Sequence, residues 1–526
     1  MTLAAIDRYD ERRISTCGDH AIVVGGSVAG LAAARVLADA FERVTVLEKD
    51  SVPDQVGNRP GVPQGNHIHV LQESGRSTLE DLLPGYCEDL LTAGGVLIDG
   101  ASDINFYDEG DYLADGPFRM PAYSASRPLF EAVLRRRVRE VDGVTLRVGS
   151  QVTDYLTEDG DERVTGVTVR QHRGETDELS GDLVVDATGR ASRTPSWLRA
   201  HGYPTPPLAE VEIHVGYSSF EIERPPADRR AYLDIPSPPH TRGGSVFPIE
   251  NDRWLVTLNG VHDDDPPTDL SSVSDFADTL VQDEISALLD TQPVVSEDVS
   301  YYPFPSSRRR HYETVDRFPE GLVVIGDAIA SFNPIYGQGM SVASLQALVL
   351  HHAIADGGLD DLGRRFFARA APVIDVAWQL AVVADHAFPE TTGPKPRGAD
   401  LFNWYLTRLT RKAQADGSLR AALFSVIAME EPPETLLRPA TAWKVLRPEG
   451  VTQPRETTRS VREFAGALSA AAFHDSDTDA KVPSANTKSR APSEASTGRN
   501  STDTAGRVGR RQDATQSDRA ATVPNQ

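Results

Sequence analysis

A glycine-rich turn near the N-terminus constrains the fold more than any other feature of the chain. The short apolar run 21–25 leads into Gly25-Gly26-Ser27-Val28-Ala29-Gly30, an alanine-rich segment follows at 28–40, and a second apolar run occupies 44–48. Short apolar runs beside glycine are typical of buried strands, and the alanine-rich segment is typical of a helix. The sequence therefore predicts a strand-turn-helix-strand unit at the start of an α/β fold.

Each position of this turn has a physical task if the unit binds a dinucleotide. Gly25 permits the tight turn, a small residue at Ser27 lets the backbone approach a pyrophosphate, and Gly30 lets helix and sheet pack closely. N–H groups at the helix start receive phosphates, and a carboxylate after the second strand accepts ribose hydroxyls, which favours the adenosine of FAD or NAD. Ser27 replaces the middle glycine of the usual pattern. The cofactor-binding residues predicted here are Gly25, Gly26, Ser27, Ala29, Gly30 and Glu48.

A second glycine-rich segment lies far along the chain. The apolar run 321–326 ends at Asp327, and Asn333-Pro334-Ile335-Tyr336-Gly337-Gln338-Gly339 leads into a helical pattern from Met340. Such a carboxylate can bind the ribityl hydroxyls of a flavin, and N–H groups at the helix start can stabilise the charge that develops on its ring upon reduction. The two motifs together predict non-covalently bound FAD. The residues expected to contact it here are Gly326, Asp327, Pro334, Gly337, Gly339 and Met340.

The remaining segments predict the domain organisation. Apolar and polar residues alternate from 141 to 186, as in a meander that returns to the first sheet, and strand-like runs between 211 and 260 are broken by Pro and Gly, as in a second, antiparallel sheet. The last segment lacks aromatic residues and is too polar to form a core. We therefore expect a mobile extension at 1–18, a discontinuous FAD-binding domain at 19–200 and 308–350, an antiparallel substrate domain at 201–307, a helical region at 351–473 and a disordered tail at 474–526.

The charge of the chain excludes nucleic acid as a partner. There are 77 acidic and 53 basic residues, for a net charge of -24, whereas nucleic-acid binding requires a basic face. Only 6 of the basic residues are lysine. A crowded carboxylate surface repels itself in dilute buffer and is screened in salt, so the pattern indicates a salt-adapted acidic protein. An ordinary acidic protein from an arginine-rich proteome is the alternative interpretation.

Cysteine usage and hydropathy predict the compartment. Cys17 and Cys87 form neither a disulfide framework nor a metal-ligand pattern, so no metal site is expected. Residues 1–20 are polar and charged rather than a signal peptide, and no apolar run is expected to approach the roughly 18 to 20 residues that span a bilayer. The sequence predicts a cytoplasmic protein with no integral membrane span.

The two motifs, together with Asp186-Ala187-Thr188-Gly189-Arg190 between them, resemble the FAD-dependent monooxygenase superfamily, which includes aromatic hydroxylases, squalene epoxidase and geranylgeranyl reductases. The closer resemblance is to bacterial polyether-type flavin epoxidases and related uncharacterised flavoproteins. It rests on Arg59-Pro60-Gly61-Val62-Pro63-Gln64 with His67 and His69, on Ser126-Arg127-Pro128-Leu129 and on Phe332-Asn333-Pro334-Ile335-Tyr336-Gly337, and covers roughly residues 18–445. It implies a glutathione-reductase-like FAD-binding Rossmann domain, an inserted antiparallel substrate domain and C-terminal helices over the site.

The resemblance also implies roles for single residues. Arg127 would lie near the FAD pyrophosphate or ribityl chain, and the backbone around Val152 would hold the adenine. Asp186 and Gly189 stand where hydroxylases carry an Asp-Gly pair linked to FAD and NADPH. Here Ala187 and Thr188 separate the two, which puts direct NADPH binding in doubt.

The sequence gives three candidate catalytic residues, His67, His69 and Tyr336, and assigns a catalytic role to none of them. The two histidines alternate on an extended segment, so they are expected to point to opposite sides. Without a third ligand they form a poor metal site. One reading gives them a structural hydrogen-bonding role, and the other places His67 or His69 beside the flavin.

The predicted reaction is insertion of oxygen, as epoxidation or hydroxylation, into an apolar small molecule through a flavin hydroperoxide. The reaction uses O2, with NAD(P)H as electron source directly or through a separate flavin reductase. The helices expected at 340–352 and 401–426 are apolar on one face and would cover the cavity. The alternatives are a geranylgeranyl-reductase-like reduction of isoprenoid double bonds, a flavin halogenase, disfavoured because no lysine occurs between Lys49 and Lys395, and a non-enzymatic flavin-binding protein.

Overall fold

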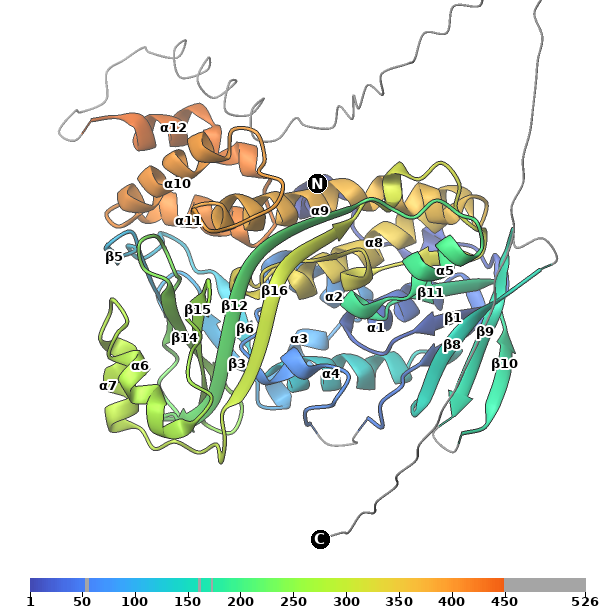
Figure 1. Ribbon diagram of the computed structural model, residues 1–526, viewed down its shortest axis with the longest axis horizontal. Helices are drawn as coiled ribbons and strands as arrows, with labels where there is room; N and C mark the ends of the chain where they lie inside the picture. Colours follow the sequence, from blue (N-terminus) through green and yellow to red (C-terminus); the bar gives the residue numbers. More distant parts are fainter. Residues whose placement is uncertain (53–55, 159–161, 172–173, 449–526) are drawn as a thin grey trace, which may run out of the picture. The chain divides into compact units, whose positions relative to one another are not determined.

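The computed structural model describes residues 1–52, 56–158, 162–171 and 174–448 (Figure 1). A parallel sheet lies at the centre of the FAD-binding part, in the order β17-β11-β1-β2-β7. Strand β11 is buried at every position, as is usual for parallel strands covered on both faces. This sheet confirms the predicted α/β fold class. Its strands are β1 (Gly18–Val24), β2 (Phe41–Leu47), β7 (Val144–Arg147), β11 (Leu183–Asp186) and β17 (Leu322–Val324).

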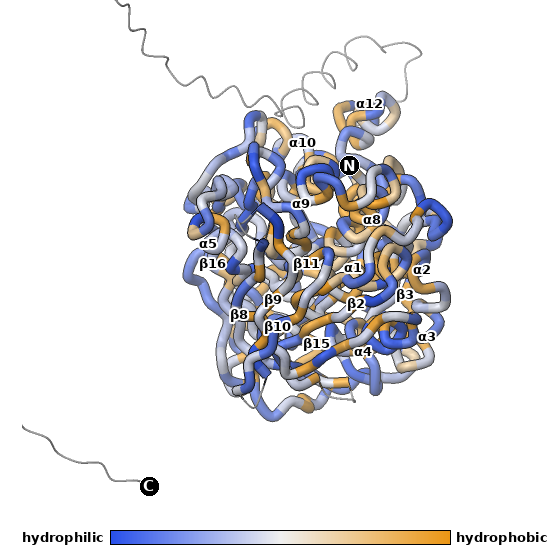
Figure 2. Tube along the Cα trace, turned by 90° about the vertical axis from the view of Figure 1, so that its right-hand side faces the viewer, coloured by the Kyte–Doolittle hydropathy of each residue, from blue (hydrophilic) through white to orange (hydrophobic). Residues whose placement is uncertain are grey.

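Helices and a small antiparallel sheet surround the parallel sheet. Helix α1 (Val28–Leu37) packs on β1 and β2 and contacts α8 (Gly339–Gly357). A Cβ atom at Gly30 would lie 1.9 Å from the Gly25 carbonyl oxygen, so only glycine allows this close approach. Figure 2 shows hydrophobic stretches along α1, α8 and the central strands. The other elements of this part are α2 (Glu73–Leu82), α3 (Tyr86–Thr92), α4 (Arg127–Arg139), α5 (Thr194–Ala200), β3 (Val96–Asp99), β6 (Pro121–Ser124), β8 (Ser150–Thr157), β9 (Val164–Gln171) and β10 (Thr176–Ser180).

A largely antiparallel sheet of eight strands forms the second layer, in the order β18-β16-β12-β15-β14-β13-β4-β5. Strand β4 pairs in parallel with β13, so a segment that we expected within the FAD-binding domain belongs to this sheet. Pairing between such distant segments has no local sequence signal. The strands are β4 (Ile104–Asp108), β5 (Asp111–Tyr112), β12 (Leu208–Glu223), β13 (Ala231–Asp234), β14 (Arg242–Ile249), β15 (Arg253–Val261), β16 (Ser300–Arg310) and β18 (Ala330–Ser331).

The two faces of the antiparallel sheet have different partners because successive residues of a strand point to opposite sides. From β15, Trp254, Val256 and Leu258 join a buried cluster with residues of α6 (Val273–Ala277) and α7 (Glu284–Thr291). The opposite face turns toward the glycine-rich turns of the first layer and lines a cavity. The sheet therefore separates a packed side from a ligand-accessible side.

In the described part of the chain, four α-helices follow α8: α9 (Leu362–Asp385), α10 (Ala399–Ala413), α11 (Gly417–Ile427) and α12 (Pro439–Leu446). By length and composition α9 is apolar enough to cross a membrane, although 67% of its most apolar window is buried within the protein, as in the core helices of soluble proteins. It contacts β17 and α8. The last three helices build a separate apolar cluster.

The N-terminal segment differs from the mobile extension that we expected. Thr2 is fully buried, and the Leu3 amide donates to the Met429 carbonyl oxygen at 3.0 Å. The Tyr9 hydroxyl donates to Asp39 at 2.6 Å. The segment is thus anchored on the body by contacts that its polar composition does not reveal. The predicted disordered tail, and the end of the predicted helical region from residue 449, lie outside the described residues.

Candidate functional site

A cavity of about 910 Å³ lies between the two layers. It is lined by the first glycine-rich turn, by β8, by the second glycine-rich turn and by the inner face of the antiparallel sheet. Two segments 300 residues apart in the chain therefore share one cavity. Of the predicted cofactor-binding residues, those lining it are Gly25, Gly26, Ser27, Ala29, Glu48, Arg127, Val152, Gly189, Asp327, Pro334, Gly337, Gly339 and Met340.

The first turn has the backbone that a dinucleotide site requires. Gly25 has φ +109°, and a Cβ atom there would lie 2.5 Å from the Ala187 carbonyl oxygen, so a larger residue is excluded. The Gly26 amide donates to Glu48 Oε2 at 2.9 Å. The second strand thus brings its terminal carboxylate against the turn, as the sequence predicted.

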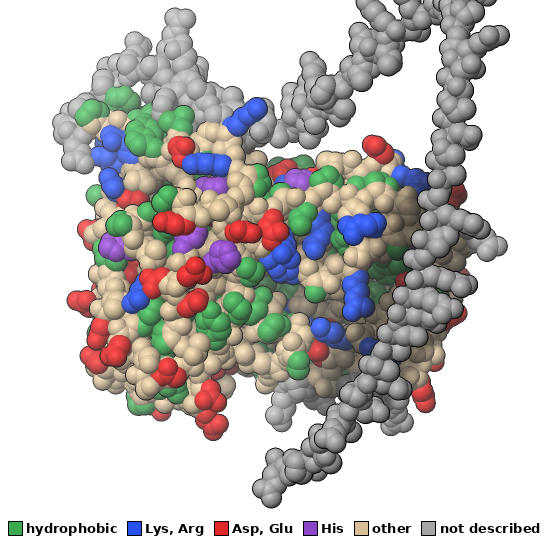
Figure 3. Space-filling view, viewed as in Figure 1, with side chains coloured by type: hydrophobic (Ala, Val, Ile, Leu, Met, Phe, Trp, Pro, Cys, Tyr) green, Lys and Arg blue, Asp and Glu red, His purple; other side chains and the backbone are tan. Residues whose placement is uncertain are grey.

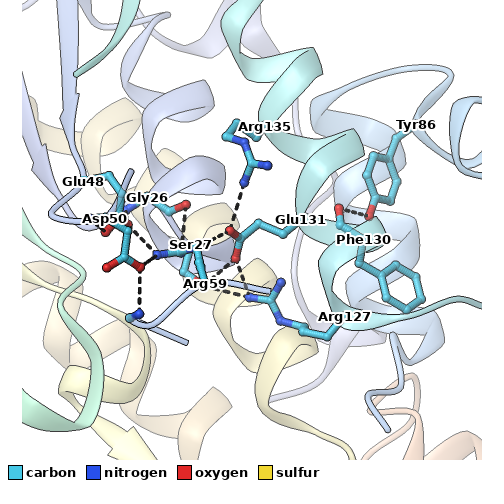
Figure 4. Close-up of polar contacts among 11 residues, drawn as sticks. Gly26, Ser27, Glu48, Asp50, Arg59, Tyr86, Arg127, Phe130, Glu131 and Arg135 are labelled. Atoms are coloured by element: carbon cyan, nitrogen blue, oxygen red, sulfur yellow. Dashed lines mark hydrogen bonds and ion pairs between the residues drawn. The ribbon is translucent and has the colours of Figure 1, made fainter. Parts of the chain in front are cut away.

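Arginine and glutamate side chains surround this turn (Figure 4). Arg59 is 7% exposed and contacts Glu48 at 3.0 Å, Asp50 at 2.9 Å and Glu131 at 2.7 Å. Arg127 contacts the second oxygen of Glu131 at 3.0 Å. Burial alone would raise the pKa of Glu131, but the neighbouring guanidinium groups of Arg127 and Arg59 hold it below its usual value. The network fixes charged side chains around the first glycine-rich turn.

Ser27 takes part in the same network. Its hydroxyl donates to Glu131 Oε2 at 3.2 Å and accepts a hydrogen bond from Arg127 at 2.8 Å. The departure from the usual glycine therefore adds a polar link between the turn and α4. Arg59 and Glu131 were not predicted as site residues; Arg59 lies in a stretch that carries the family resemblance, whereas Glu131 has no signal beyond its place on an amphipathic helix.

The second turn presents Asp327 and a chain of backbone groups to the cavity. Burial raises the pKa of Asp327 to about 6, while Arg190 and Arg127 act in the opposite direction. Gly337 has φ +63° and ends a short helical turn before α8. The carboxylate and the start of α8 thus lie at the same cavity wall, which suits ribityl hydroxyls and an electron-rich ring.

Three predicted cofactor-binding residues do not line the cavity: Gly30, Asp186 and Gly326. Asp186 is fully buried, and its oxygens accept hydrogen bonds from Thr188 and Ser192 at 2.6 Å. It organises the turn after β11 and does not line the cavity. The two glycines allow close packing, since a Cβ atom at Gly326 would lie 2.7 Å from that of Ala29.

The candidate catalytic residues differ in position. His67 and His69 both line the cavity, whereas Tyr336 does not, and its hydroxyl donates to Asp385 at 3.0 Å. His67 Nδ1 lies 2.8 Å from the Ser219 hydroxyl on the antiparallel sheet. Burial lowers the pKa of His67 to about 4 and that of His69 to about 3, with Arg127 also lowering the latter. Both imidazoles are therefore neutral at pH 7.

The C-terminal helices do not cover the cavity as we expected. Beyond α8, which contributes Met340 and Ala343, no described residue of α9 to α12 lines it. Their apolar faces pack on one another and on β4. The aromatic wall comes instead from the antiparallel sheet, through Tyr217, Phe247 and Tyr302.

The residues around the cavity fit FAD. The first glycine-rich turn, the start of α1 and the guanidinium groups beside it suit the phosphates, and Glu48 and Asp327 suit the two sets of sugar hydroxyls. Among the described residues no cluster of three or more His, Cys, Asp or Glu side chains could hold a metal ion.

Known proteins share these features. A family described as FAD binding domain matches residues 20–356. Protein Rv3254 of Mycobacterium tuberculosis (strain ATCC 25618 / H37Rv) is 34% identical over 414 residues, which are 75% of this chain and 87% of that protein. The FAD-dependent monooxygenase atnJ of Arthrinium sp is 24% identical over 346 residues, covering 62% and 73% of the two chains. The structure of the flavin-dependent brominase Bmp2 superposes with a TM-score of 0.57 at 18% identity, over 78% of this chain and 94% of that chain.

A Rossmann-type sheet whose two glycine-rich turns meet at one cavity defines an FAD-dependent oxidoreductase. The chain belongs to the FAD binding domain family, within the FAD-dependent monooxygenase superfamily. Membership implies O2 and a small molecule as substrates.

Proposed function

We propose that the protein is a monooxygenase that inserts one oxygen atom of O2 into a neutral, largely apolar small molecule. The observation that carries this proposal is the continuity of the cavity from the dinucleotide turn to the inner face of the antiparallel sheet. A substrate on that face would lie beside the second glycine-rich turn, where the resemblance puts the flavin ring. Bound FAD, once reduced, supplies the activation of O2.

The chain's own residues bind the cofactor, orient the substrate and exclude water from the cavity. Glu48 and Asp327 accept hydrogen bonds from the cofactor sugars, Arg127 offsets phosphate charge, and the backbone at Val152 contacts the adenine. The aromatic rings of Phe247, Tyr217 and Tyr302 form part of the wall that keeps water from the reacting atoms. No acid or base from the protein is obligatory for oxygen transfer to an electron-rich substrate.

The balanced reaction consumes one O2, one NAD(P)H and one proton, and it yields oxygenated substrate, NAD(P)+ and water. The interrupted Asp186 to Gly189 segment favours reduction through a separate flavin reductase over direct NADPH binding. We place the enzyme in the cytoplasm, since its two cysteines are free in the structure.

Purified FAD-loaded protein incubated with NAD(P)H and ¹⁸O2 tests the proposal, with and without an added flavin reductase. Incorporation of one ¹⁸O atom into an alkene or arene substrate is expected. Saturation of an isoprenoid double bond without isotope would indicate a reductase, and halide-dependent product would indicate a halogenase; either result would overturn the proposal.

A further inference from the structure

Polar side chains occupy part of the cavity-facing side of the antiparallel sheet. Tyr217 on β12 is paired with Asn259 on β15, and Ser219 is paired with Thr257 two residues further along. Because side chains alternate along a strand, these four share one face. Tyr217, Thr257 and Asn259 line the cavity, and all four are at most 5% exposed. The wall opposite the second glycine-rich turn is therefore not uniformly apolar.

Two nitrogen atoms on this wall have no hydrogen-bond partner among the described residues. They are Asn259 Nδ2 and His67 Nε2, and both side chains are more than nine-tenths buried. Leaving a buried polar group unpaired costs about 1 to 3 kcal/mol, so unpaired atoms on residues that line a cavity suggest a site for a polar ligand.

A chain of hydrogen bonds holds the His67 ring in place. His67 Nδ1 lies 2.8 Å from the Ser219 hydroxyl, which lies 2.6 Å from the Thr257 hydroxyl. The Ile68 amide donates to Thr257 at 3.3 Å. Because either hydroxyl can be the donor, the neutral ring can take either tautomer, and Nε2 can accept a hydrogen bond from a ligand hydroxyl or donate one to a carbonyl oxygen. The chain fixes where the ring points and leaves its polarity adaptable.

Among the described residues, no strand of the antiparallel sheet contributes a lysine or arginine side chain to the cavity. Those that line it are Lys49, Arg59, Arg127, Arg190 and Arg193; Arg190 reaches the sheet by donating to the Ser306 carbonyl oxygen on β16, and Asp234 on β13 adds a carboxyl group. An anionic group placed against Asn259 would therefore be buried without a counter-charge from the sheet, at high cost.

We propose that Asn259 Nδ2 and His67 Nε2 bind a hydroxyl or carbonyl group of the substrate, so that the substrate is a neutral oxygenated ring or chain rather than a hydrocarbon. This assignment rests on the proposed function and narrows its substrate class. The remaining wall, with Phe247 and Tyr302, packs against the apolar body of the same molecule. A site built to bond a hydroxyl group discriminates strongly against the analogue that lacks it.

Titration of the FAD-loaded, full-length protein with naphthalene, 1-naphthol and 1-naphthoate tests the proposal, with ligand-induced change in the flavin absorption spectrum as readout. The protein should bind 1-naphthol about 10-fold or more tightly than naphthalene, because naphthol gains two hydrogen bonds. It should bind 1-naphthoate more weakly than 1-naphthol. Equal affinity for naphthol and naphthalene, or stronger binding of naphthoate, would overturn it.

Variants give a second test. Asn259→Leu should remove most of the preference for 1-naphthol while naphthalene affinity and FAD content are retained. Ser219→Ala, which frees the His67 ring, should weaken 1-naphthol binding, whereas Ser218→Ala provides the matched control because Ser218 faces away and bonds the Pro267 carbonyl oxygen. Unchanged selectivity in both Asn259→Leu and Ser219→Ala would refute the proposed binding of the substrate oxygen by Asn259 and His67. Because binding needs no turnover, selective binding without ¹⁸O incorporation would reject the monooxygenase proposal and leave the proposed oxygen-binding role of these two residues intact.

Discussion

The Tyr217 hydroxyl donates a hydrogen bond of 2.9 Å to Asn333 Oδ1. This bond joins the antiparallel sheet to the second glycine-rich turn, and the Ile335 amide donates to the same hydroxyl at 3.1 Å. Asn333 in turn donates from Nδ2 to Asp385 on α9 at 2.8 Å. The wall that we assign to the substrate and the turn that we assign to the flavin are thus held by one buried network.

Removal of the Tyr217 hydroxyl should destabilise this junction. Tyr217→Phe keeps the ring but removes one donor from Asn333 Oδ1, which then accepts only the longer hydrogen bond, of 3.2 Å, from the Ile335 amide among the described residues. The free energy of unfolding should therefore fall by about 1 to 3 kcal/mol. Denaturant unfolding of the FAD-loaded protein measures the change. Tyr301→Phe is the control, since Tyr301 is 38% exposed and its hydroxyl donates to Asp265 at 3.0 Å. A loss in this control as large as that of Tyr217→Phe would show that the junction has no special role.

Asp327 should determine flavin retention. Asp327→Asn removes the charge that strengthens hydrogen bonds to sugar hydroxyls, each worth about 1.5 to 3 kcal/mol, so FAD affinity should fall about 10- to 100-fold. Equilibrium dialysis with FAD gives the affinity. The control is Asp360→Asn, an exposed carboxylate away from the cavity. Wild-type affinity in Asp327→Asn would remove this residue from the cofactor site.

Arg59 should be essential for folding as well as for the site. Arg59→Gln leaves Glu48, Asp50 and Glu131 buried without their shared counter-ion, and breaking a buried pair in this way costs about 3 to 5 kcal/mol. The measurement is thermal unfolding at pH 7. Arg136→Gln breaks an exposed pair with Asp89 and should cost less than about 1 kcal/mol. Similar losses in the two variants would contradict the importance of the buried network.

Local sequence signals predicted the elements around both glycine-rich turns. The turn at Gly25 and the turn at Gly337 each carry positive φ angles that glycine adopts readily, and short apolar strands precede them. The placement of β4 in the second sheet was missed because Ile104 pairs with Ala231, more than a hundred residues away. No periodicity in either segment specifies its partner.

The polar residues of the substrate wall were missed for a different reason. Thr257 and Asn259 alternate with apolar residues, and this pattern is also typical of a strand with one solvent-exposed face. Only the tertiary structure shows that the polar side faces a cavity. Similarly, Asp186 looked like a cofactor ligand by its place in the chain, whereas its bonds to Thr188 and Ser192 place it in the core.

Asp385 should make stability depend on pH. Burial raises the pKa of Asp385 to about 7, against which Asn333 and Tyr336 act by hydrogen bonding. The folded-state pKa lies above the unfolded value of about 3.9, so the folded protein holds this proton more tightly than the unfolded chain. The stability that this pKa difference contributes is fully present below about pH 3.9 and is lost as pH rises toward 7.

Asp385→Asn removes this titration, so between about pH 4 and pH 7 the wild type should lose stability relative to the variant by at most about 4 kcal/mol. Denaturant unfolding at several pH values measures the difference between the two proteins. Burial also raises the pKa of Asp108 and Asp234 to about 7, but both residues are present in each protein, so their contributions to the stability difference cancel. A pH-independent difference would mean that Asp385 is ionised in the folded protein throughout this range.

Salt should stabilise the folded protein. The chain carries a net charge of -24, and on the face drawn in Figure 3 acidic side chains predominate around α6 and α7. Repulsion among exposed carboxylates falls as the Debye length shortens from about 10 Å at 0.1 M salt to about 3 Å at 1 M. The melting temperature should therefore rise steeply between about 0.1 and 1 M KCl and more slowly up to about 3 M, where screening adds little. Reversal of surface charge separates screening from general salting effects. A variant with the exposed residues Asp290, Glu297 and Asp298 changed to Lys, none of which lies at the start of a helix, should melt higher than wild type in about 0.1 M KCl and respond less to added salt. A flat or falling curve for the wild type, or an equal salt response in the variant, would show that surface repulsion does not limit its stability.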